Sequence, residues 1–259
     1  MALARADLES LLRARQLDRT LTTSLPALDQ RDEVAAAPSG VASLDARLGG
    51  GFPRGQLSEI VGPRSSGRTS LLLQLVADAT ARGELVAVID ALDTLDVESA
   101  AAAGVDLARL LWVRGHVVCN PGLCGDLNQR ALEQAIRAFT LVLQAGNFSL
   151  VALDVAEAPA QALRRLPFTT WMRLQRMVEG TQTACVLIGS QPMARSAAGL
   201  TLQLGIRDSG LGIRDSGFGI RFGDLLFDGL TVEARVIRAR AREREEASVA
   251  FTTLASNCA

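Results

Sequence analysis

The chain contains one segment whose spacing is that of a phosphate-binding loop. Residues Gly62–Thr69 follow the pattern GxxxxGK[ST], with Arg68 in place of the lysine. In such a loop, backbone N–H groups and the positive end of the following helix bind phosphate, while the threonine hydroxyl reaches Mg²⁺. We therefore expect ATP and Mg²⁺ to bind here. The residues expected to bind the nucleotide are Gly62, Pro63, Arg64, Ser65, Ser66, Gly67, Arg68, Thr69 and Ser70.

Arg68 has two interpretations. A guanidinium is broader than an ammonium group, so it grips phosphate oxygens from outside, which predicts weakened catalysis with some phosphate affinity retained. The alternative is compositional, because the chain has no lysine and all 27 of its basic residues are arginine. A replacement of that kind is tolerated only where lysine is not essential. Both interpretations predict that nucleotide hydrolysis is slow or absent, so the enzymatic activity is at most a weak ATPase.

The elements around the loop alternate between strand and helix. A strand over Leu57–Val61 enters the loop, and a helix from Thr69 to about Ala81 leaves it. This order predicts an α/β fold in which a mainly parallel sheet is flanked by helices and ends in antiparallel strands. The other expected strands are 84–90, 108–113, 149–154, 184–191, 231–240 and 248–254, and the other expected helices are 43–48, 126–144 and 169–179.

Polar residues end three of the apolar strands, namely Asp90, Asp154 and Gln191. The carboxyl ends of parallel strands line the ligand crevice of such a sheet. Asp154 follows a buried strand, which is the position of an aspartate that holds Mg²⁺ through water. A structural role for Asp154 as a helix cap is the alternative.

Composition and charge limit the remaining classes of function. The net charge of −1 gives no global positive field for nucleic acid or an anionic membrane. We find no apolar run long enough to span a membrane and no signal-peptide stretch, so we expect a cytoplasmic protein. His116, Cys119 and Cys124 lie close in sequence, but they lack a fourth ligand and CxxC spacing, so no zinc site is expected.

The predicted organisation has three parts. Residues 1–20 form an N-terminal helix that we expect to mediate self-association or partner docking, residues 21–39 are a linker, and residues 40–259 are the core. Within the core, a seven-residue unit repeats near 205–221. It is either a duplication in a surface hairpin or a basic loop that contacts DNA or a partner.

From about Gly40 to Arg240 the chain resembles the RecA family of recombinase ATPases. The segment Gly40–Gly55 resembles the family's lead-in to its phosphate loop, and Gly62–Gly67 matches the loop itself apart from Arg64. The resemblance implies that Asp96 contacts adenine and that Gln191 senses the γ-phosphate. It also implies that Arg238 and Arg240 reach the ATP of a neighbouring subunit. Two other readings of these arginines stay open, which are DNA phosphate binding and protection of an edge strand by charge.

Several residues depart from the family pattern. Leu92 stands where the resemblance places a catalytic glutamate, and Ser99 stands where it places an adenine-stacking tyrosine. Leucine cannot position or activate water. The two segments that match the family's DNA-binding loops are short. The first carries Arg164 and Arg165, which could contact DNA or a subunit, and the second covers only about 192–198.

This combination of losses resembles the RecA-like accessory proteins of the bacterial mutagenic translesion cassette, the ImuA family. The resemblance implies a role in the DNA damage (SOS) response and translesion synthesis. The implied partners are ImuB, a relative of Y-family polymerases, and RecA, with weak or indirect DNA contact. Two alternatives remain: an active DNA-dependent ATPase or recombinase, and a nucleotide-free interaction scaffold such as a division inhibitor.

Overall fold

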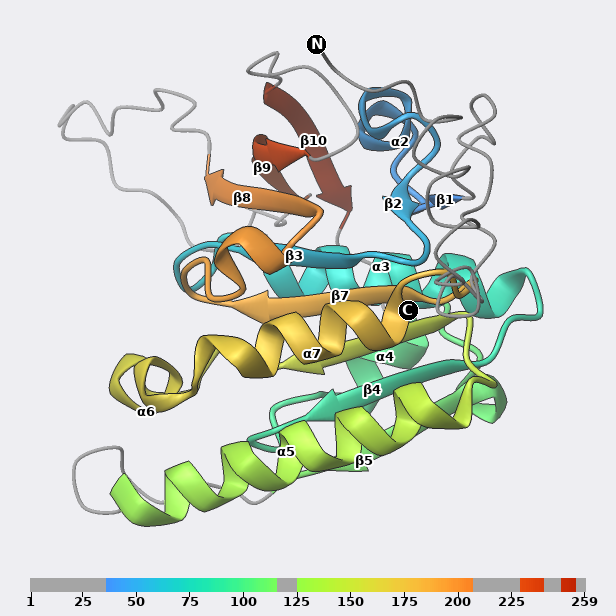
Figure 1. Ribbon diagram of the computed structural model, residues 1–259. Coiled ribbons are helices and arrows are strands. Elements are labelled where there is room, and N and C mark those ends of the chain that lie inside the picture. The colour runs from blue at the N-terminus through green and yellow to red at the C-terminus, as the bar shows by residue number, and fades with distance from the viewer. Residues whose placement is uncertain (1–35, 116–124, 207–228, 240–247, 255–259) are drawn as a thin grey trace, which may run out of the picture. The chain divides into compact units, whose positions relative to one another are not determined.

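The computed structural model describes residues 36–115, 125–206, 229–239 and 248–254. In this part of the chain one mixed sheet contains eight strands in the order β10-β9-β8-β3-β7-β6-β4-β5 (Figure 1). The strands are β3 (Leu57–Val61), β4 (Val86–Asp90), β5 (Leu110–Arg114), β6 (Leu150–Asp154), β7 (Ala184–Gly189), β8 (Leu200–Ile206), β9 (Gly229–Ala239) and β10 (Ser248–Leu254).

The sheet is parallel from β8 to β5 and antiparallel at its other end. β3 pairs in parallel with β7 on one side and β8 on the other, while β9 runs antiparallel to both β8 and β10. This confirms the predicted α/β fold with antiparallel strands near the C-terminus. A separate pair, β1 (Ala36–Ala37) with β2 (Phe52–Pro53), precedes the sheet.

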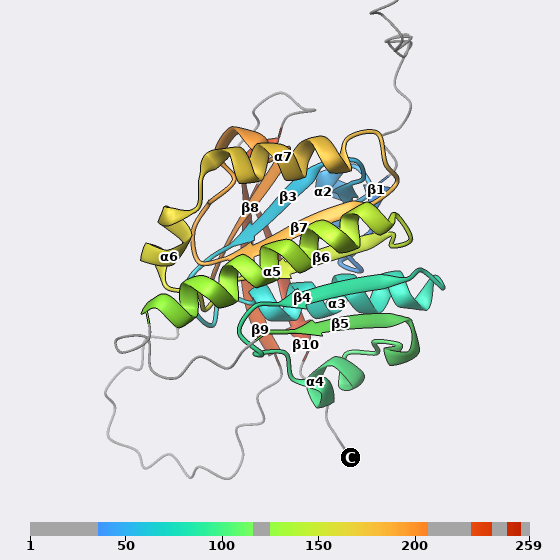
Figure 2. The ribbon, with the colours of Figure 1, turned by 60° about the horizontal axis from the view of Figure 1, so that its bottom comes forward.

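Helices cover both faces of the parallel part (Figures 1 and 2). One hydrophobic cluster joins the sheet to α2 (Ala42–Leu48), α3 (Arg68–Ala81) and α4 (Val97–Ala102). The other cluster joins the opposite face to α5 (Gly125–Ala145), α6 (Ala160–Arg165) and α7 (Phe168–Val178). The short 3₁₀ helices are η2 (Leu107–Arg109) and η3 (Arg195–Ala197).

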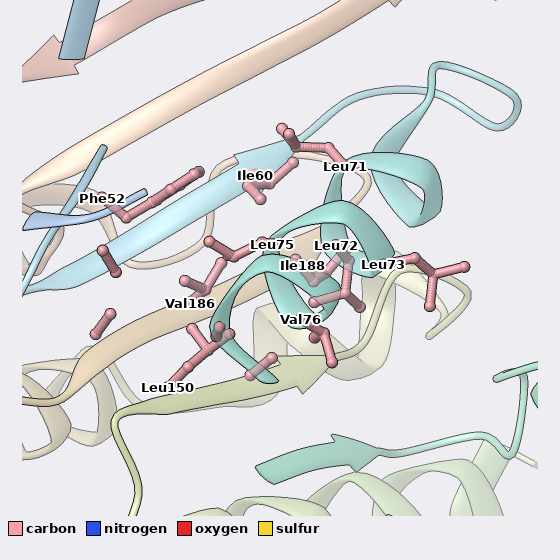
Figure 3. Packing of buried hydrophobic residues seen from close by; sticks show 14 of the residues in the cluster. Phe52, Ile60, Leu71, Leu72, Leu73, Leu75, Val76, Leu150, Val186 and Ile188 are labelled. Atoms are coloured by element: carbon pink, nitrogen blue, oxygen red, sulfur yellow. The ribbon is translucent and has the colours of Figure 1, made fainter. Parts of the chain in front are cut away.

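Alternation along β3 decides which side chains meet each helical layer. Ile60 lies in the cluster with α3, whereas Leu57 lies in the cluster with α7. Figure 3 shows Leu72 and Leu75 of α3 packed near Ile188 of β7. Because strand residues are buried on both faces, β4 and β7 read as nearly continuous apolar runs rather than alternating ones.

Some boundaries differ from the expectation. β7 ends at Gly189, so Gln191 lies two residues beyond the strand. The segment expected to be a short loop after Asp154 contains the helix α6, which begins after Pro159 and ends before Pro167. α4 is a second helix that the apolar pattern did not predict. Proline favours the start of α6 and prevents its continuation.

Three predicted segments lie wholly or mostly outside the described residues. These are the N-terminal helix over 1–20, the linker over 21–39 and most of the repeat near 205–221. The last residues of the predicted linker are described, and they include β1.

Candidate nucleotide-binding site

The predicted phosphate loop connects β3 directly to α3. Gly67 has φ +89°, a left-handed conformation that glycine adopts without strain, and α3 begins at the next residue. A Cβ at Gly67 would lie 2.6 Å from a methyl carbon of Val232 in β9, and a Cβ at Gly62 would lie 2.5 Å from the carbonyl oxygen of Leu204 in β8. Both glycines are therefore required, because the loop packs tightly against neighbouring strands.

The loop presents donors that the protein itself does not use. Within the described chain, we find no protein acceptor for the backbone N–H groups of Gly67, Arg68, Thr69 and Ser70. These groups form the first turn of a helix of 14 residues, where the helix dipole is positive. The buried hydroxyl of Ser66 also has no hydrogen-bond partner. This arrangement is suited to binding an anion such as phosphate.

Arg68 is buried rather than extended into solvent, with 7% of its side chain exposed. One terminal nitrogen, Nη2, lies 3.4 Å from a carboxylate oxygen of Glu157, whereas Nη1 is buried without a hydrogen-bond partner. Arg64, which is 83% exposed, contacts the other oxygen of Glu157 at 2.6 Å. Glu157 thus bridges two arginines of the loop, a contact that the sequence did not predict.

Asp154 and Thr69 are the residues expected to hold Mg²⁺. Asp154 ends β6, and its Oδ1 accepts a hydrogen bond of 2.8 Å from the backbone N–H of Ala156. Burial raises the pKa of Asp154 to about 6, and the nearby carboxylate of Asp90 contributes to the increase. The exposed Thr69 lies in the first turn of α3. One carboxylate and one hydroxyl fit Mg²⁺, which is commonly bound by few protein groups together with phosphate and water.

Apolar side chains surround Leu92, which stands at the position expected for a catalytic glutamate. Leu92 packs against the hydrophobic cluster that contains α5 and α7. Asp93 does not replace a glutamate, since its carboxylate forms two hydrogen bonds of 2.8 Å with Arg114. Asp93 has φ +57°, and the chain forms a turn here. Asp90 is buried and accepts from the backbone of Leu95, which makes it a structural residue.

Asp96, the residue expected to contact adenine, caps α4. Its carboxylate accepts hydrogen bonds from the backbone N–H and the hydroxyl of Ser99, and these bonds lower its pKa. Ser99 therefore supports Asp96 directly. Both side chains are exposed, and their place beside adenine stays a prediction.

Gln191 and Arg164 share a cavity of about 340 Å³ between α6, α7 and the segment after β7. Arg195 and Trp171 also line this cavity, whereas Arg165 is exposed and does not. Arg238 in β9 donates a hydrogen bond of 2.6 Å to the backbone carbonyl of Arg195. Arg240 lies outside the described residues.

The sequence did not predict the role of Glu59. This glutamate lies in β3 and is fully buried. Its Oε1 accepts from the backbone N–H groups of Met193 and Ala194 at 2.8 and 2.7 Å, and its Oε2 accepts from the hydroxyl of Thr201 at 2.9 Å. The strand that enters the phosphate loop therefore also anchors the segment that follows Gln191.

No helix in the described part of the chain has the length and hydropathy needed to span a membrane. The same part of the chain holds no group of three or more His, Cys, Asp or Glu side chains that could bind a metal ion. His116, Cys119 and Cys124 fall outside this part, so the expected absence of zinc there stays a prediction.

The strand, loop and helix together define an α/β protein with a P-loop at the centre of its sheet. The model of the RecA N-terminal domain family matches residues 15–158. The chain therefore belongs to the RecA N-terminal domain family.

Individual relatives match a shorter region. The chain is 40% identical to protein RecA of Clavibacter michiganensis over 131 residues, which are 50% of this chain and 32% of the relative. It is 48% identical to protein RecA of a Picosynechococcus strain over 79 residues, which are 30% of this chain and 23% of the relative. The matched region thus spans 23–32% of the length of these curated relatives.

Proposed function

We propose that this protein is a cytoplasmic RecA-like accessory factor in the bacterial DNA damage response and in mutagenic translesion synthesis. It acts through protein contacts, and ATP binding at Gly62–Thr69 regulates those contacts. The observation that carries the proposal is the contrast between two parts of one site. The loop retains its glycines and has backbone donors without an acceptor among the described residues, whereas Leu92, at the position that the resemblance assigns to a catalytic glutamate, packs against a hydrophobic cluster.

The residues of the site have separate roles in this proposal. Thr69 and Asp154 would hold Mg²⁺, which would supply positive charge to the phosphate groups. Arg68 contributes a buried positive charge to phosphate binding. With no carboxylate at position 92 to orient water, hydrolysis is expected to be very slow.

The segments that resemble DNA-binding loops support a role in protein contacts. One of them contains the helix α6, and the other contains η3 and is tied to Glu59 by two hydrogen bonds. Such short, fixed segments are poorly suited to holding stretched DNA. We therefore propose the ImuB-type polymerase relative as the main partner, with RecA as a second partner and DNA contact weak or indirect. A homo-oligomer also belongs to this proposal.

The nucleotide part of the proposal is tested by titrating labelled ATP with Mg²⁺ into the purified full chain and by measuring phosphate release. The wild type should bind weakly and turn over far more slowly than a RecA protein assayed beside it. Arg68→Lys should tighten binding without restoring turnover, and Asp154→Ala should weaken binding. Fast turnover that Asp154→Ala abolishes would indicate an active ATPase, and the absence of binding by both wild type and Arg68→Lys would indicate a scaffold.

The partner part needs its own experiment. Light scattering after size-exclusion chromatography should show a complex between this chain and the ImuB-type protein of the same bacterium. Its yield should change when ATP and Mg²⁺ are present. A mixture that elutes as separate components with and without ATP would refute the proposed role.

A further inference from the structure

The most unusual contact of the site is the carboxylate of Glu157 between two arginines of the phosphate loop. Its Oε2 lies 2.6 Å from Arg64 Nη2 and 2.8 Å from Arg64 Nε, and its Oε1 lies 3.4 Å from Arg68 Nη2. The protein's own negative charge is thus placed against the positive groups that a phosphate would use. A carboxylate and a phosphate oxygen are alternative partners for the same guanidinium donors.

The two arginines are held very differently. Arg64 is 83% exposed, so its ion pair is screened by solvent and is worth little by itself. Arg68 is 7% exposed and is the first residue of α3, so its guanidinium is largely removed from solvent. Among the described residues its buried Nη1 has no hydrogen-bond partner, and its Nη2 reaches Glu157 only at 3.4 Å. A buried guanidinium in this condition is incompletely neutralised and remains available for a better anion.

Glu157, like Arg64, is accessible to solvent. Its side chain is 32% exposed, and it lies in the connection between β6 and α6 rather than inside an element. Among the described residues, its carboxylate accepts hydrogen bonds from Arg64 and Arg68. Glu157 can therefore turn toward solvent, and the only buried donor in the described chain that loses its acceptor is that of Arg68. A bound phosphate would then accept from this donor.

We propose that Glu157 is an internal anion that competes with nucleotide phosphate for the arginines of the loop, and that it sets the affinity of the site. The inference rests on the proposed nucleotide binding. The ligand class is a di- or triphosphate with Mg²⁺, because several phosphoryl groups carry more charge and more acceptor oxygens than one carboxylate. A ligand with a single phosphate competes less well, since it offers the loop less negative charge in exchange for that of Glu157.

The test compares the full-length wild type with Glu157→Gln, Glu157→Ala and the control Glu133→Gln. Glu133 is an exposed residue of α5 that hydrogen-bonds to Gln129 and does not touch the loop. Titration calorimetry with Mg·ATP, and with inorganic pyrophosphate as a minimal probe, gives the affinities. Both Glu157 variants should bind each probe about tenfold more tightly than wild type, because a like charge is removed from the phosphate site. The affinity of Glu133→Gln should be unchanged.

The outcomes separate this inference from the proposed function. If the wild type binds Mg·ATP but neither Glu157 variant binds more tightly, Glu157 does not compete and the nucleotide site stands. If neither the wild type nor the Glu157 variants bind Mg·ATP or pyrophosphate, both proposals fail. A gain limited to Glu157→Ala, with none for the nearly isosteric Glu157→Gln, would indicate relief of crowding and would overturn the electrostatic explanation.

Discussion

Replacement of Asp154 by asparagine should stabilise the protein that has no nucleotide bound. Burial raises the pKa of Asp154 from 3.8 to about 6, so the folded state holds this proton more tightly than the unfolded chain does. A difference of about two pKa units corresponds to about 3 kcal/mol. This contribution favours folding below pH 4, and it is lost as the pH rises from about 4 to about 6. Above pH 6 the buried charge is therefore a cost that asparagine removes.

The assay is urea unfolding of the wild type and Asp154→Asn at pH 8 and at pH 4. At pH 8 the variant should have the larger free energy of unfolding, by about 2–3 kcal/mol, because asparagine can still accept the hydrogen bond from Ala156. At pH 4 most of this difference should disappear. The control is Asp93→Asn, since pairing with Arg114 lowers the pKa of Asp93 and its removal should give no stabilisation. Equal stabilities at pH 8, or a gain of the same size at both pH values, would refute the reasoning.

Three other changes test the packing around the site. Gly67→Ala should lower the free energy of unfolding in urea clearly more than Gly104→Ala. The two glycines have φ of +89° and +88°, but only at Gly67 would the added Cβ meet a neighbour, Val232 at 2.6 Å. Equal losses would show that backbone strain alone matters. Glu59→Ala should cost about 3 kcal/mol by leaving buried donors without an acceptor, whereas Glu59→Gln should cost less. Arg54→Ala should lower the thermal midpoint by several degrees, since Arg54 bonds two backbone carbonyls and an acid, and an unchanged midpoint would contradict this.

The phosphate loop and most of the sheet could be predicted because their signals are local. The short strand β3, the glycines of the loop and the apolar pattern of α3 all lie within about 25 residues of each other. α4 could have been found from Asp96, whose side chain caps the helix three residues before Ser99. The prolines at 159 and 167 likewise marked the limits of α6.

The roles of Glu59 and Glu157 could not be predicted in this way. Glu59 interrupts an apolar strand. Its carboxylate accepts hydrogen bonds from residues that lie 134 and 135 positions further along the chain. Glu157 follows a strand without any pattern, and its partner Arg68 is 89 positions distant. A single sequence gives no information on such pairings, because they depend on how the strands are ordered in the sheet. The orientation of Arg68 toward Glu157 is a consequence of the same order.

The attachment of Glu59 restricts how Gln191 can move. Met193 and Ala194 are bonded to β3, and β7 ends at Gly189, so the segment between these two fixed points has only three residues. Gln191 is the middle one. A displacement of Gln191 therefore requires rotation of backbone dihedral angles within residues 190–192, because the chain is fixed on both sides of them. Movement of the whole segment as a free loop would first require the two hydrogen bonds from Met193 and Ala194 to the buried Glu59 carboxylate to break.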